Sequence, residues 1–325
     1  MLDSCFLLLN NNPIIHPKEY KMKKVLILLF VAALTVTTVF ANGNAEAAAD
    51  DGQIVIGMTV PGMQFPFFVI MGEKAQAKAD ELGIKLIIHD SQNQSSTQMS
   101  AVENFVAQKV DGILISPMTT DSQVPAIEAA VAAGIPVATV DRKANTNKVL
   151  IHVGADNVEG GRSAARYIID QLGGKGKVIE LEGTPGSSAA IDRKAGFDEI
   201  MAGSGVEIVV SQTAEFSRSK GQTVMENLIQ AYPDFDAVFG ANDEMIIGAI
   251  EAMTASGIDP ASKITVGFDA TPDAFAYIDD GKLDVTVDQF PGKQAGQAIQ
   301  ALYDYITAGT KPADDVVYIK PLPMP

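Results

Sequence analysis

Asp141 and Arg142 stand side by side directly after the apolar segment "PVATV" at residues 136–140. Two adjacent opposite charges can form a surface ion pair that contributes little to stability. They can also form the polar part of a binding site. Ligands of open α/β sheets bind outside the carboxyl ends of the strands, so the residues that follow the other predicted strands decide between these interpretations.

Polar and aromatic side chains also follow the other apolar segments. They include Phe65–Phe68, Ser116, Asp156–Asn157, the segment "GTPGSSAAIDR" at residues 183–193, Asn242–Asp243, Asp269 and Gln289. Asp, Asn, Gln and Arg each present two hydrogen-bonding atoms in one plane, a spacing that matches vicinal hydroxyl groups. Phenylalanine rings can cover the C–H faces of a sugar ring. This composition favours a small neutral polyol as the ligand.

The sequence lacks the common motifs that would indicate an enzyme. It contains no Walker-type or dinucleotide-binding glycine loop and no G-x-S-x-G elbow. His89 and His152 lie inside predicted strands without metal-ligand spacing, so we interpret both as structural. Asp269 and Asp273 resemble a carboxylate pair, but "DATPD" is more typical of a helix start with Thr271 as its cap. We therefore expect no enzyme activity, metal or cofactor.

The N-terminal 41 residues predict a secretory signal peptide. Lys21, Lys23 and Lys24 precede the apolar run "VLILLFVAALTVTTVF", and Val39 and Ala41 suit the −3 and −1 positions of a cleavage site. The run is short for a membrane anchor, which needs about 20 apolar residues. We expect cleavage near Ala41, with translation starting at Met1 or Met22.

Composition narrows the class of protein. The only cysteine, Cys5, lies in the predicted leader, so the exported chain has no disulfide and no lipid-accepting thiol. The net charge changes from −16 to −18 on cleavage, because the leader carries four lysines and two acidic residues. Such a chain repels phosphate backbones, which argues against nucleic acid as a partner. We expect a soluble exported protein.

The chain from residue 53 alternates short β-branched segments with longer segments of helical spacing. This pattern predicts an α/β fold with parallel sheets covered on both faces. About eleven strands are too many for one open sheet, so we expect two lobes, each with a doubly wound sheet of five or six strands. The boundary is expected near "VGADNVEGG" at residues 153–161.

Residues 53–320 resemble the periplasmic sugar-binding proteins of the ribose-binding type, the substrate-capturing components of ABC importers. The resemblance is carried in order by "PFFV", "HDSQNQ", "TVDRKA", "ADNVEGG", "VIELEG", "SSAAIDRKAGF", "SQTAEFSRSKG", "FGANDEM", "VGFDATPD" and "DGKLDVTVDQFP". It implies two similar lobes that are joined by three hinge crossings and close on the sugar. It also implies an ABC permease as partner. On this basis lobe 1 comprises residues 42–155 and 290–317, and lobe 2 comprises residues 156–289 and 318–325.

The resemblance also implies the residues that bind the sugar. Phe67 and Phe68 match its aromatic wall, and Phe216 matches the opposing aromatic residue of the second lobe. The matching hydrogen-bonding residues are Asp141, Arg142, Arg193, Asn242, Asp269 and Gln289. Asp156 is an additional candidate.

Two positions depart from the ribose type. Phe65 and Ser116 stand where that type has Asn. We therefore expect a pentose or related monosaccharide, with ribose as the best single candidate.

Two alternatives share the fold. A sugar-sensing partner of a chemoreceptor or of a two-component sensor cannot be separated from a transport protein by sequence. The effector domain of a lac-repressor-like regulator would need an N-terminal helix-turn-helix and a basic patch. The acidic chain with its predicted signal peptide argues against that regulator.

Overall fold

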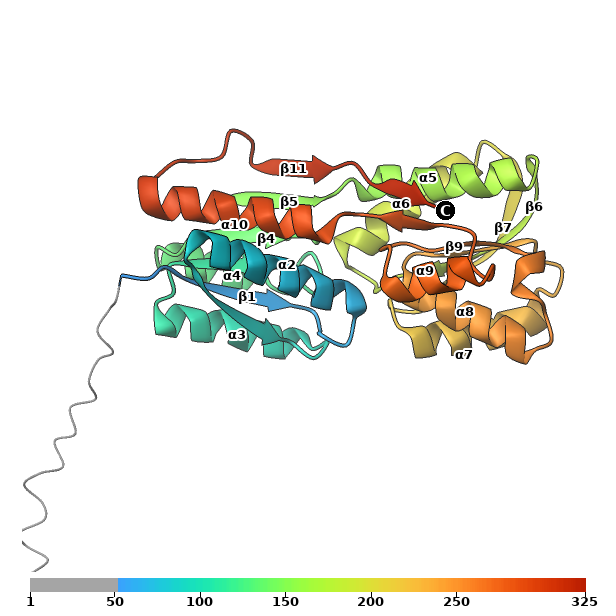
Figure 1. Ribbon diagram of the computed structural model, residues 1–325, viewed down its shortest axis with the longest axis horizontal. Helices are drawn as coiled ribbons and strands as arrows, with labels where there is room; N and C mark the ends of the chain where they lie inside the picture. The colour runs from blue at the N-terminus through green and yellow to red at the C-terminus, as the bar shows by residue number, and fades with distance from the viewer. Residues whose placement is uncertain (1–51) are drawn as a thin grey trace, which may run out of the picture. The chain divides into compact units, whose positions relative to one another are not determined.

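The computed structural model describes residues 52–325, of which Gln53–Pro325 form one compact unit. The predicted leader and the cleavage position near Ala41 lie outside the described residues. Within the described part, no helix is long and apolar enough to span a bilayer. The unit contains two large sheets, each with its own helices, and a third sheet of only two strands (Figure 1). We call the first sheet with its helices lobe 1, and the second sheet with its helices lobe 2.

Lobe 1 contains a six-stranded sheet in the order β11-β5-β4-β3-β1-β2, with every neighbouring pair parallel. Its strands are β1 (Val55–Val60), β2 (Lys85–Asp90), β3 (Gly112–Ile115), β4 (Val137–Val140), β5 (Ile151–Ala155) and β11 (Val316–Ile319). Its helices are α2 (Pro66–Leu82), α3 (Ser95–Gln108), α4 (Val124–Ala132) and α10 (Pro291–Ala308). Helices α2 and α10 pack together, as do α3 and α4 (Figure 1).

Lobe 2 contains a four-stranded parallel sheet in the order β7-β6-β8-β9. Its strands are β6 (Lys175–Glu182), β7 (Gly205–Thr213), β8 (Ala237–Gly240) and β9 (Ile264–Val266). The helices are α5 (Asn157–Gln171), α6 (Ser188–Met201), α7 (Arg218–Ala231), α8 (Asp243–Ala255), a short 3-10 turn η1 (Pro260–Ser262) and α9 (Pro272–Asp279). Helix α5 packs against α6, and α7 packs against α8.

The structure confirms the predicted α/β class with parallel sheets, but the second sheet is smaller than expected. The predicted strand near residues 284–290 meets β9 through a single bridge between Val266 and Val285. Strand β10 (Thr286–Asp288) then pairs antiparallel with β12 (Leu322–Met324). The expectation of five or six strands is wrong here because parallel pairing with β9 does not continue beyond that bridge.

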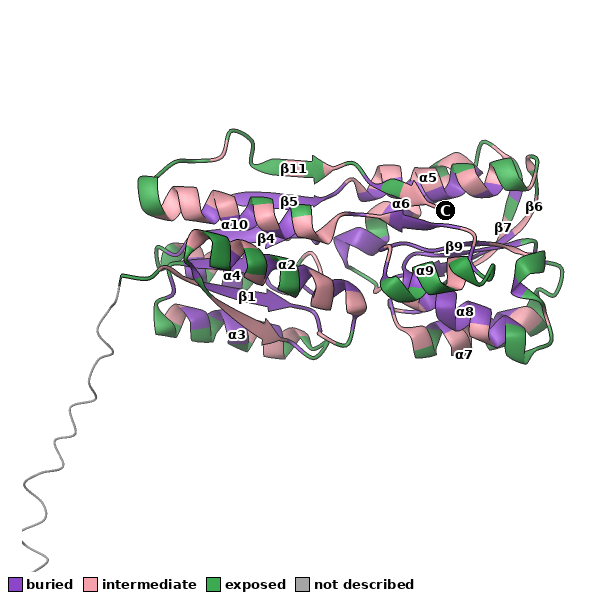
Figure 2. Ribbon diagram, viewed as in Figure 1, coloured by how far each residue is buried: buried purple, intermediate pink, exposed green. Residues whose placement is uncertain are grey.

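Burial follows the position of each strand in its sheet. Every residue of the central strands β3, β4, β5 and β8 is buried, and Figure 2 shows this for β5. Helices cover both faces of such strands, which explains their continuous apolar sequences. The edge strand β11 instead exposes Val316 and Tyr318 on alternate positions. Hydrophobic burial is therefore concentrated between each sheet and its helices.

The chain passes between the two sheets three times. It crosses after β5, after β10, and between β11 and β12. The predicted lobe limit at residue 317 falls inside β11, which belongs to the first sheet. The three passages lie next to one another at the hydrogen bond from Asp156 N to Ile319 O (3.0 Å) and at the β10–β12 pair.

Candidate functional site

A narrow cavity lies between the lobes at the carboxyl ends of their strands. Its lining comprises Phe65, Phe67, Phe68, Asp141, Arg142, Ala189, Arg193, Phe216, Asn242, Asp269 and Gln289. The structure therefore brings together all nine principal residues predicted from the sequence, and Phe65 with them. Ala189, in the first turn of α6, was not predicted, because an alanine carries no chemical signal.

The first turn of α2 supplies the aromatic side of the cavity. Pro66 begins the helix and Phe65 occupies the cap position without a side-chain hydrogen bond. The ring of Phe68 meets the ring of Phe67 edge-on at 5.2 Å and that of Phe65 at 6.3 Å. Edge-to-face pairs at these separations are favourable, so the three rings stabilise one another as a wall.

A tight turn after β4 places Asp141 and Arg142 in the cavity. Asp141 has a left-handed backbone (φ 62°), and Arg142 N donates to Val140 O at 2.7 Å. Ser116 Oγ donates to Asp141 Oδ2 at 2.9 Å. Ser116 does not line the cavity, so the structure places it behind Asp141 rather than beside a ligand.

Arg142 is buried with only part of its hydrogen-bonding capacity used. Its NH1 donates to Met118 O at 3.1 Å, and its Nε lies 3.7 Å from Asp141 Oδ2. Its guanidinium carbon lies 5.5 Å from the Phe68 ring centre and 5.3 Å from that of Phe216. The Nε hydrogen has no hydrogen-bond partner among the described residues. An unsatisfied buried donor costs about 1–3 kcal/mol, which a ligand hydroxyl would relieve.

Close packing of α5 on α6 fixes Arg193. A side chain at Gly161 would place its first carbon 2.0 Å from Arg193 O, so only glycine permits this approach. Arg193 Nε then donates to Asn157 Oδ1 at 2.8 Å and NH1 donates to Ala241 O at 2.7 Å. Its guanidinium carbon lies 3.7 Å from the centre of the Phe268 ring. Arg193 is therefore held on three sides by the protein itself.

The remaining polar residues of lobe 2 bond one another or the backbone. Asn242 caps α8 by accepting from Met245 N at 3.0 Å, and its Nδ2 donates to Phe216 O at 3.2 Å. Gln289 Nε2 donates to Asp269 Oδ1 at 2.6 Å. Asn242 is thus the cap of α8, and one of its two amide hydrogens stays available.

Phe216 enters the cavity through a left-handed turn between β7 and α7. Glu215 and Phe216 have φ values of 53° and 60°. The ring covers Gly183, where a Cβ atom would lie 2.1 Å from the ring carbon Cζ. Gly183 therefore makes the space into which the aromatic ring folds.

The charges in the cavity balance. Burial raises the pKa of Asp141 and of Asp269, while Arg142 and Arg193 respectively oppose the increase. Burial likewise lowers the pKa of both arginines, which still stay protonated in proteins. Two cations and two carboxylates leave no net charge for a ligand to neutralise. The electrostatics favour a neutral ligand.

The other predicted residues have local roles. Asp156 Oδ1 accepts from Glu159 N at 3.0 Å as the cap of α5, and Asp156 does not line the cavity. His152 Nδ1 lies 3.0 Å from Thr139 Oγ1 within the lobe 1 core. Thr271 caps α9 as predicted, with Pro272 following it. Among residues 52–325, no group of three His, Cys, Asp or Glu side chains is placed to hold a metal.

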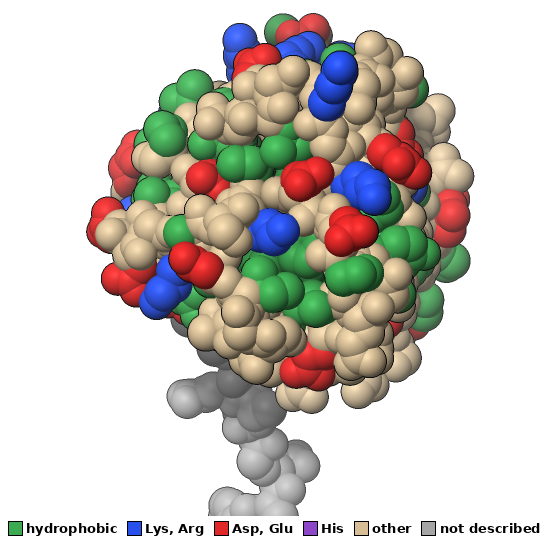
Figure 3. Space-filling model, turned by 90° about the vertical axis from the view of Figure 1, so that its right-hand side faces the viewer, with side chains coloured by type: hydrophobic (Ala, Val, Ile, Leu, Met, Phe, Trp, Pro, Cys, Tyr) green, Lys and Arg blue, Asp and Glu red, His purple; other side chains and the backbone are tan. Residues whose placement is uncertain are grey.

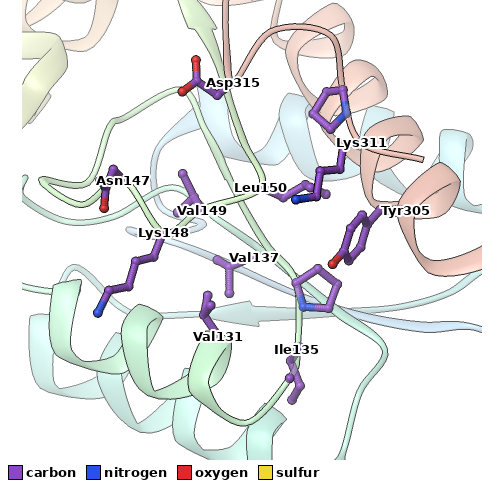
Figure 4. A pocket seen from close by; sticks show the side chains of 13 residues that line it. Val131, Ile135, Val137, Asn147, Lys148, Val149, Leu150, Tyr305, Lys311 and Asp315 are labelled. Atoms are coloured by element: carbon purple, nitrogen blue, oxygen red, sulfur yellow. The ribbon is translucent and has the colours of Figure 1, made fainter. Parts of the chain in front are cut away.

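A second hollow lies at the opposite end of the lobe 1 sheet, next to the start of β4 and β5 (Figure 4). Apolar side chains such as Val131 and Leu150 line it together with Lys148 and Lys311. Lys148 already pairs with Glu128 at 2.7 Å. At the far end of lobe 2, acidic and basic side chains are interspersed with apolar ones (Figure 3). Neither surface gathers the convergent polar groups that the cavity between the lobes has.

Comparison with known proteins agrees with this geometry. Residues 56–311 match the family model described as "Periplasmic binding protein domain". Ribose import binding protein RbsB of Bacillus subtilis is 46% identical over 76% of this chain and 80% of its own. The protein of the same name from Escherichia coli is 38% identical over 89% of this chain and 94% of its own.

Solved structures give the same picture. A galactofuranose-binding protein superposes with a TM-score of 0.80 and is 34% identical, with 83% of this chain and 94% of that chain covered. A Caulobacter myo-inositol-binding protein, bound to myo-inositol, gives a TM-score of 0.79 at 33% identity over 83% of this chain and 93% of its own. This chain therefore belongs to the periplasmic binding protein family.

Proposed function

We propose that this protein is the exported sugar-capturing component of an ABC importer, and that its ligand is D-ribose or a closely related monosaccharide. The observation that carries the proposal is the charge-balanced cavity between the lobes, with aromatic rings and convergent polar side chains. Relatives named for ribose, galactofuranose and myo-inositol support a small neutral polyol. The two relatives named for ribose make D-ribose the first candidate.

The cavity residues suggest how the sugar is held. Phe67, Phe68 and Phe216 cover the C–H faces of the ring. Hydrogen bonds to the hydroxyls come from the six polar residues Asp141, Arg142, Arg193, Asn242, Asp269 and Gln289. A sugar that lacks one hydroxyl leaves a buried group unpaired, and sites of this kind reject such analogues strongly. The protein makes and breaks no covalent bond in this function.

Capture requires the two lobes to separate and close. We propose that the lobes divide after residue 155, after residue 289 and after β11 rather than at residue 317, with the three passages as the hinge. Three contacts between lobe 1 and lobe 2 support closure of the cleft as part of capture. Lys143 Nζ lies 2.8 Å from Asp192 Oδ2, Lys143 N donates to Ser188 Oγ at 2.8 Å, and Thr120 N donates to Gly186 O at 2.9 Å.

Export to the periplasm and delivery to a permease complete the proposal. Cleavage near Ala41 would release a soluble monomer that meets the permease in its closed, sugar-bound form. N-terminal sequencing of the protein from a periplasmic fraction tests the export. A partner gene set with a sensor kinase or chemoreceptor and without an ATPase and permease would favour the sensing role instead.

Calorimetry with a panel of pentoses and hexoses tests the ligand. The protein is unfolded, dialysed and refolded first, so that retained sugar does not block the site, and the removed material is identified by mass spectrometry. We expect saturable one-to-one binding, strongest for D-ribose. Silence across the whole panel would overturn the proposal, and preference for another monosaccharide would replace only the name of the sugar.

A further inference from the structure

Asp243 is a fully buried carboxylate that lies behind the cavity without lining it. It follows the cavity residue Asn242 in the first turn of α8. Thr271 N donates to its Oδ2 at 2.8 Å and Thr271 Oγ1 does so at 3.0 Å, while Thr286 Oγ1 donates to its Oδ1 at 2.6 Å. Asp243 therefore connects three separate segments of lobe 2.

All the partners of this carboxylate act as donors. Thr271 Oγ1 already accepts from Ala274 N, and Thr286 Oγ1 already accepts from Ala270 N. Each hydroxyl thus has its own proton left for Asp243. The arrangement fits an ionised carboxylate, which accepts all three hydrogen bonds without any reorientation of the two hydroxyls.

The segment held by Asp243 has an unfavourable backbone conformation. Asp269 and Ala270 have φ values of 119° and 53°, in a region that residues other than glycine rarely adopt. Asp243 N donates to Phe268 O at 2.7 Å, and a Cβ on Gly267 would lie 2.4 Å from Asp243 Oδ1. Such conformations persist where the surroundings fix them, and Asp243 provides contacts on both sides of Asp269.

The same contacts reach Gln289. Thr286 begins β10, and Gln289 follows that strand, where its side chain donates to Asp269 Oδ1. Phe268 precedes Asp269 in the same segment, and the centre of its ring lies 3.7 Å from the guanidinium carbon of Arg193. We propose that Asp243 is a positioning residue for ligand binding, whose carboxylate fixes Asp269 and Gln289 in the orientation that receives the ligand. This role rests on the proposed sugar-binding function.

The electrostatic surroundings give this role a pH dependence. Burial raises the pKa of Asp243 to about 7. The charged groups that face it are Glu244 on α8, Asp269 on the held segment and Arg193 on α6. As the pH falls through this range, Asp243 takes up a proton and loses an acceptor site for Thr271 or Thr286. Affinity for the sugar should therefore decrease on the acid side of neutrality.

Calorimetry with D-ribose at pH 8 and pH 6 tests the role, using Asp243→Asn and the unchanged protein. If D-ribose gives no heat, the best monosaccharide of the panel replaces it. At pH 8 we expect Asp243→Asn to bind about tenfold more weakly, the size expected for hydrogen bonds to a charged group. At pH 6 the difference in affinity between the two proteins should shrink, because Asp243 of the unchanged protein is then largely protonated. Asp259→Asn, an exposed cap in the same lobe, should match the unchanged protein at both pH values.

The outcomes separate the two proposals. Binding by the unchanged protein together with equal binding by Asp243→Asn overturns the positioning role alone. A tenfold loss of the same size at both pH values also overturns it, since a general structural defect would give that result. If Asp243→Asn does not fold, Thr286→Val removes one bond to the same carboxylate and is judged by the same two criteria. No binding of any sugar by the unchanged protein overturns the proposed function and this role with it.

Discussion

Lobe 1 lines the cavity with the rings of Phe65, Phe67 and Phe68 and the pair Asp141 and Arg142, whereas lobe 2 lines it mainly with polar groups that already bond one another. The difference is clearest in the two arginines. Arg193 has hydrogen bonds from Nε and NH1, while Arg142 leaves Nε without a partner in the described chain. Lobe 2 is preorganised, and lobe 1 keeps unsatisfied capacity for the ligand.

This contrast suggests a division of work between the lobes. Preorganised donors and acceptors cost little conformational entropy on binding, so lobe 2 is suited to meet the sugar first. The rings of lobe 1 add apolar coverage and dispersion contacts, which are less directional. Substitutions that separate stability from binding can test the contrast.

Arg193→Ala should have the largest effect, on both stability and binding. It removes two hydrogen bonds and the contact with Phe268, and it leaves Asp269 buried without the cation 3.6 Å away. Breaking a buried ion pair from one side costs about 3–5 kcal/mol. Urea unfolding measures the loss of stability and calorimetry measures the loss of sugar binding. Arg166→Ala, which removes a partly exposed pair with Glu159, should change stability by less than about 1 kcal/mol.

Arg142→Ala should weaken binding while costing less stability than Arg193→Ala. Both arginines pair with a buried carboxylate, at 3.7 and 3.6 Å, but the Arg142 side chain has one protein hydrogen bond, to Met118 O, where Arg193 has two. The expected loss of binding free energy is about 1.5–3 kcal/mol, as for hydrogen bonds to charged groups. Calorimetry and urea unfolding on the same preparation separate the two quantities. Equal losses from Arg142→Ala and Arg193→Ala in both assays would remove the distinction between the lobes.

Much of the fold and most of the cavity were predictable from the sequence, for identifiable reasons. Central strands such as β4 are covered on both faces, so their uninterrupted apolar segments mark them clearly. Parallel strands bring their carboxyl ends to one edge of a sheet, so the residues after β8 and β9 had to lie close together. That the residues after β4, in the other sheet, face them was implied only by the family resemblance. Phe216 follows an edge strand and was identified only through the family resemblance.

The predictions that were wrong or absent share a physical cause. The spacing of the strands predicts which end of a sheet a residue occupies, but not which neighbouring group its side chain bonds. Ser116 and Asp156 both follow strands, yet Ser116 bonds Asp141 and Asp156 caps α5. The proposed role of Asp243 depends on hydrogen bonds from Thr271 and Thr286, which are remote from it in sequence. The size of the second sheet was wrong because one bridge, at Val285, decides whether a strand joins it.

The lobes should also differ in how their stability responds to pH. Burial in lobe 1 lowers the pKa of His152 to about 3, below its usual value of about 6.5. The unfolded chain therefore binds a proton first, and stability is lost as the pH falls from about 6.5 towards 3. Asp243 in lobe 2 has the opposite sign, because its folded pKa of about 7 exceeds its usual value and favours the folded state in acid.

His152→Gln isolates the contribution of lobe 1. Between pH 6.5 and pH 5 the histidine should cost the unchanged protein about 1.6 kcal/mol, because the unfolded side chain is half protonated at pH 6.5 and almost fully protonated at pH 5. The variant should lack this component, so its stability should change less with acid. Urea unfolding at the two pH values gives the difference. Identical pH profiles for the two proteins would contradict a neutral, buried His152.

The smallest effect is expected where the lobes touch each other beside the cavity. The pair Lys143 and Asp192 joins lobe 1 to lobe 2 at 2.8 Å, and Lys148 and Glu128 form a comparable pair at 2.7 Å within lobe 1. Both pairs are partly exposed, so each is worth about 0.2–1 kcal/mol at most. Only the first pair is broken when the lobes separate, and its loss lowers the population of the closed form that holds the ligand. Lys143→Ala should therefore weaken sugar binding by about two- to fivefold, through faster release, while Lys148→Ala should leave affinity unchanged.

Stopped-flow dissociation measurements at low and high salt provide the check. Added salt screens the Lys143–Asp192 pair in the unchanged protein and should bring its release rate towards that of Lys143→Ala. Equal release rates for both variants would show that closure does not depend on this contact.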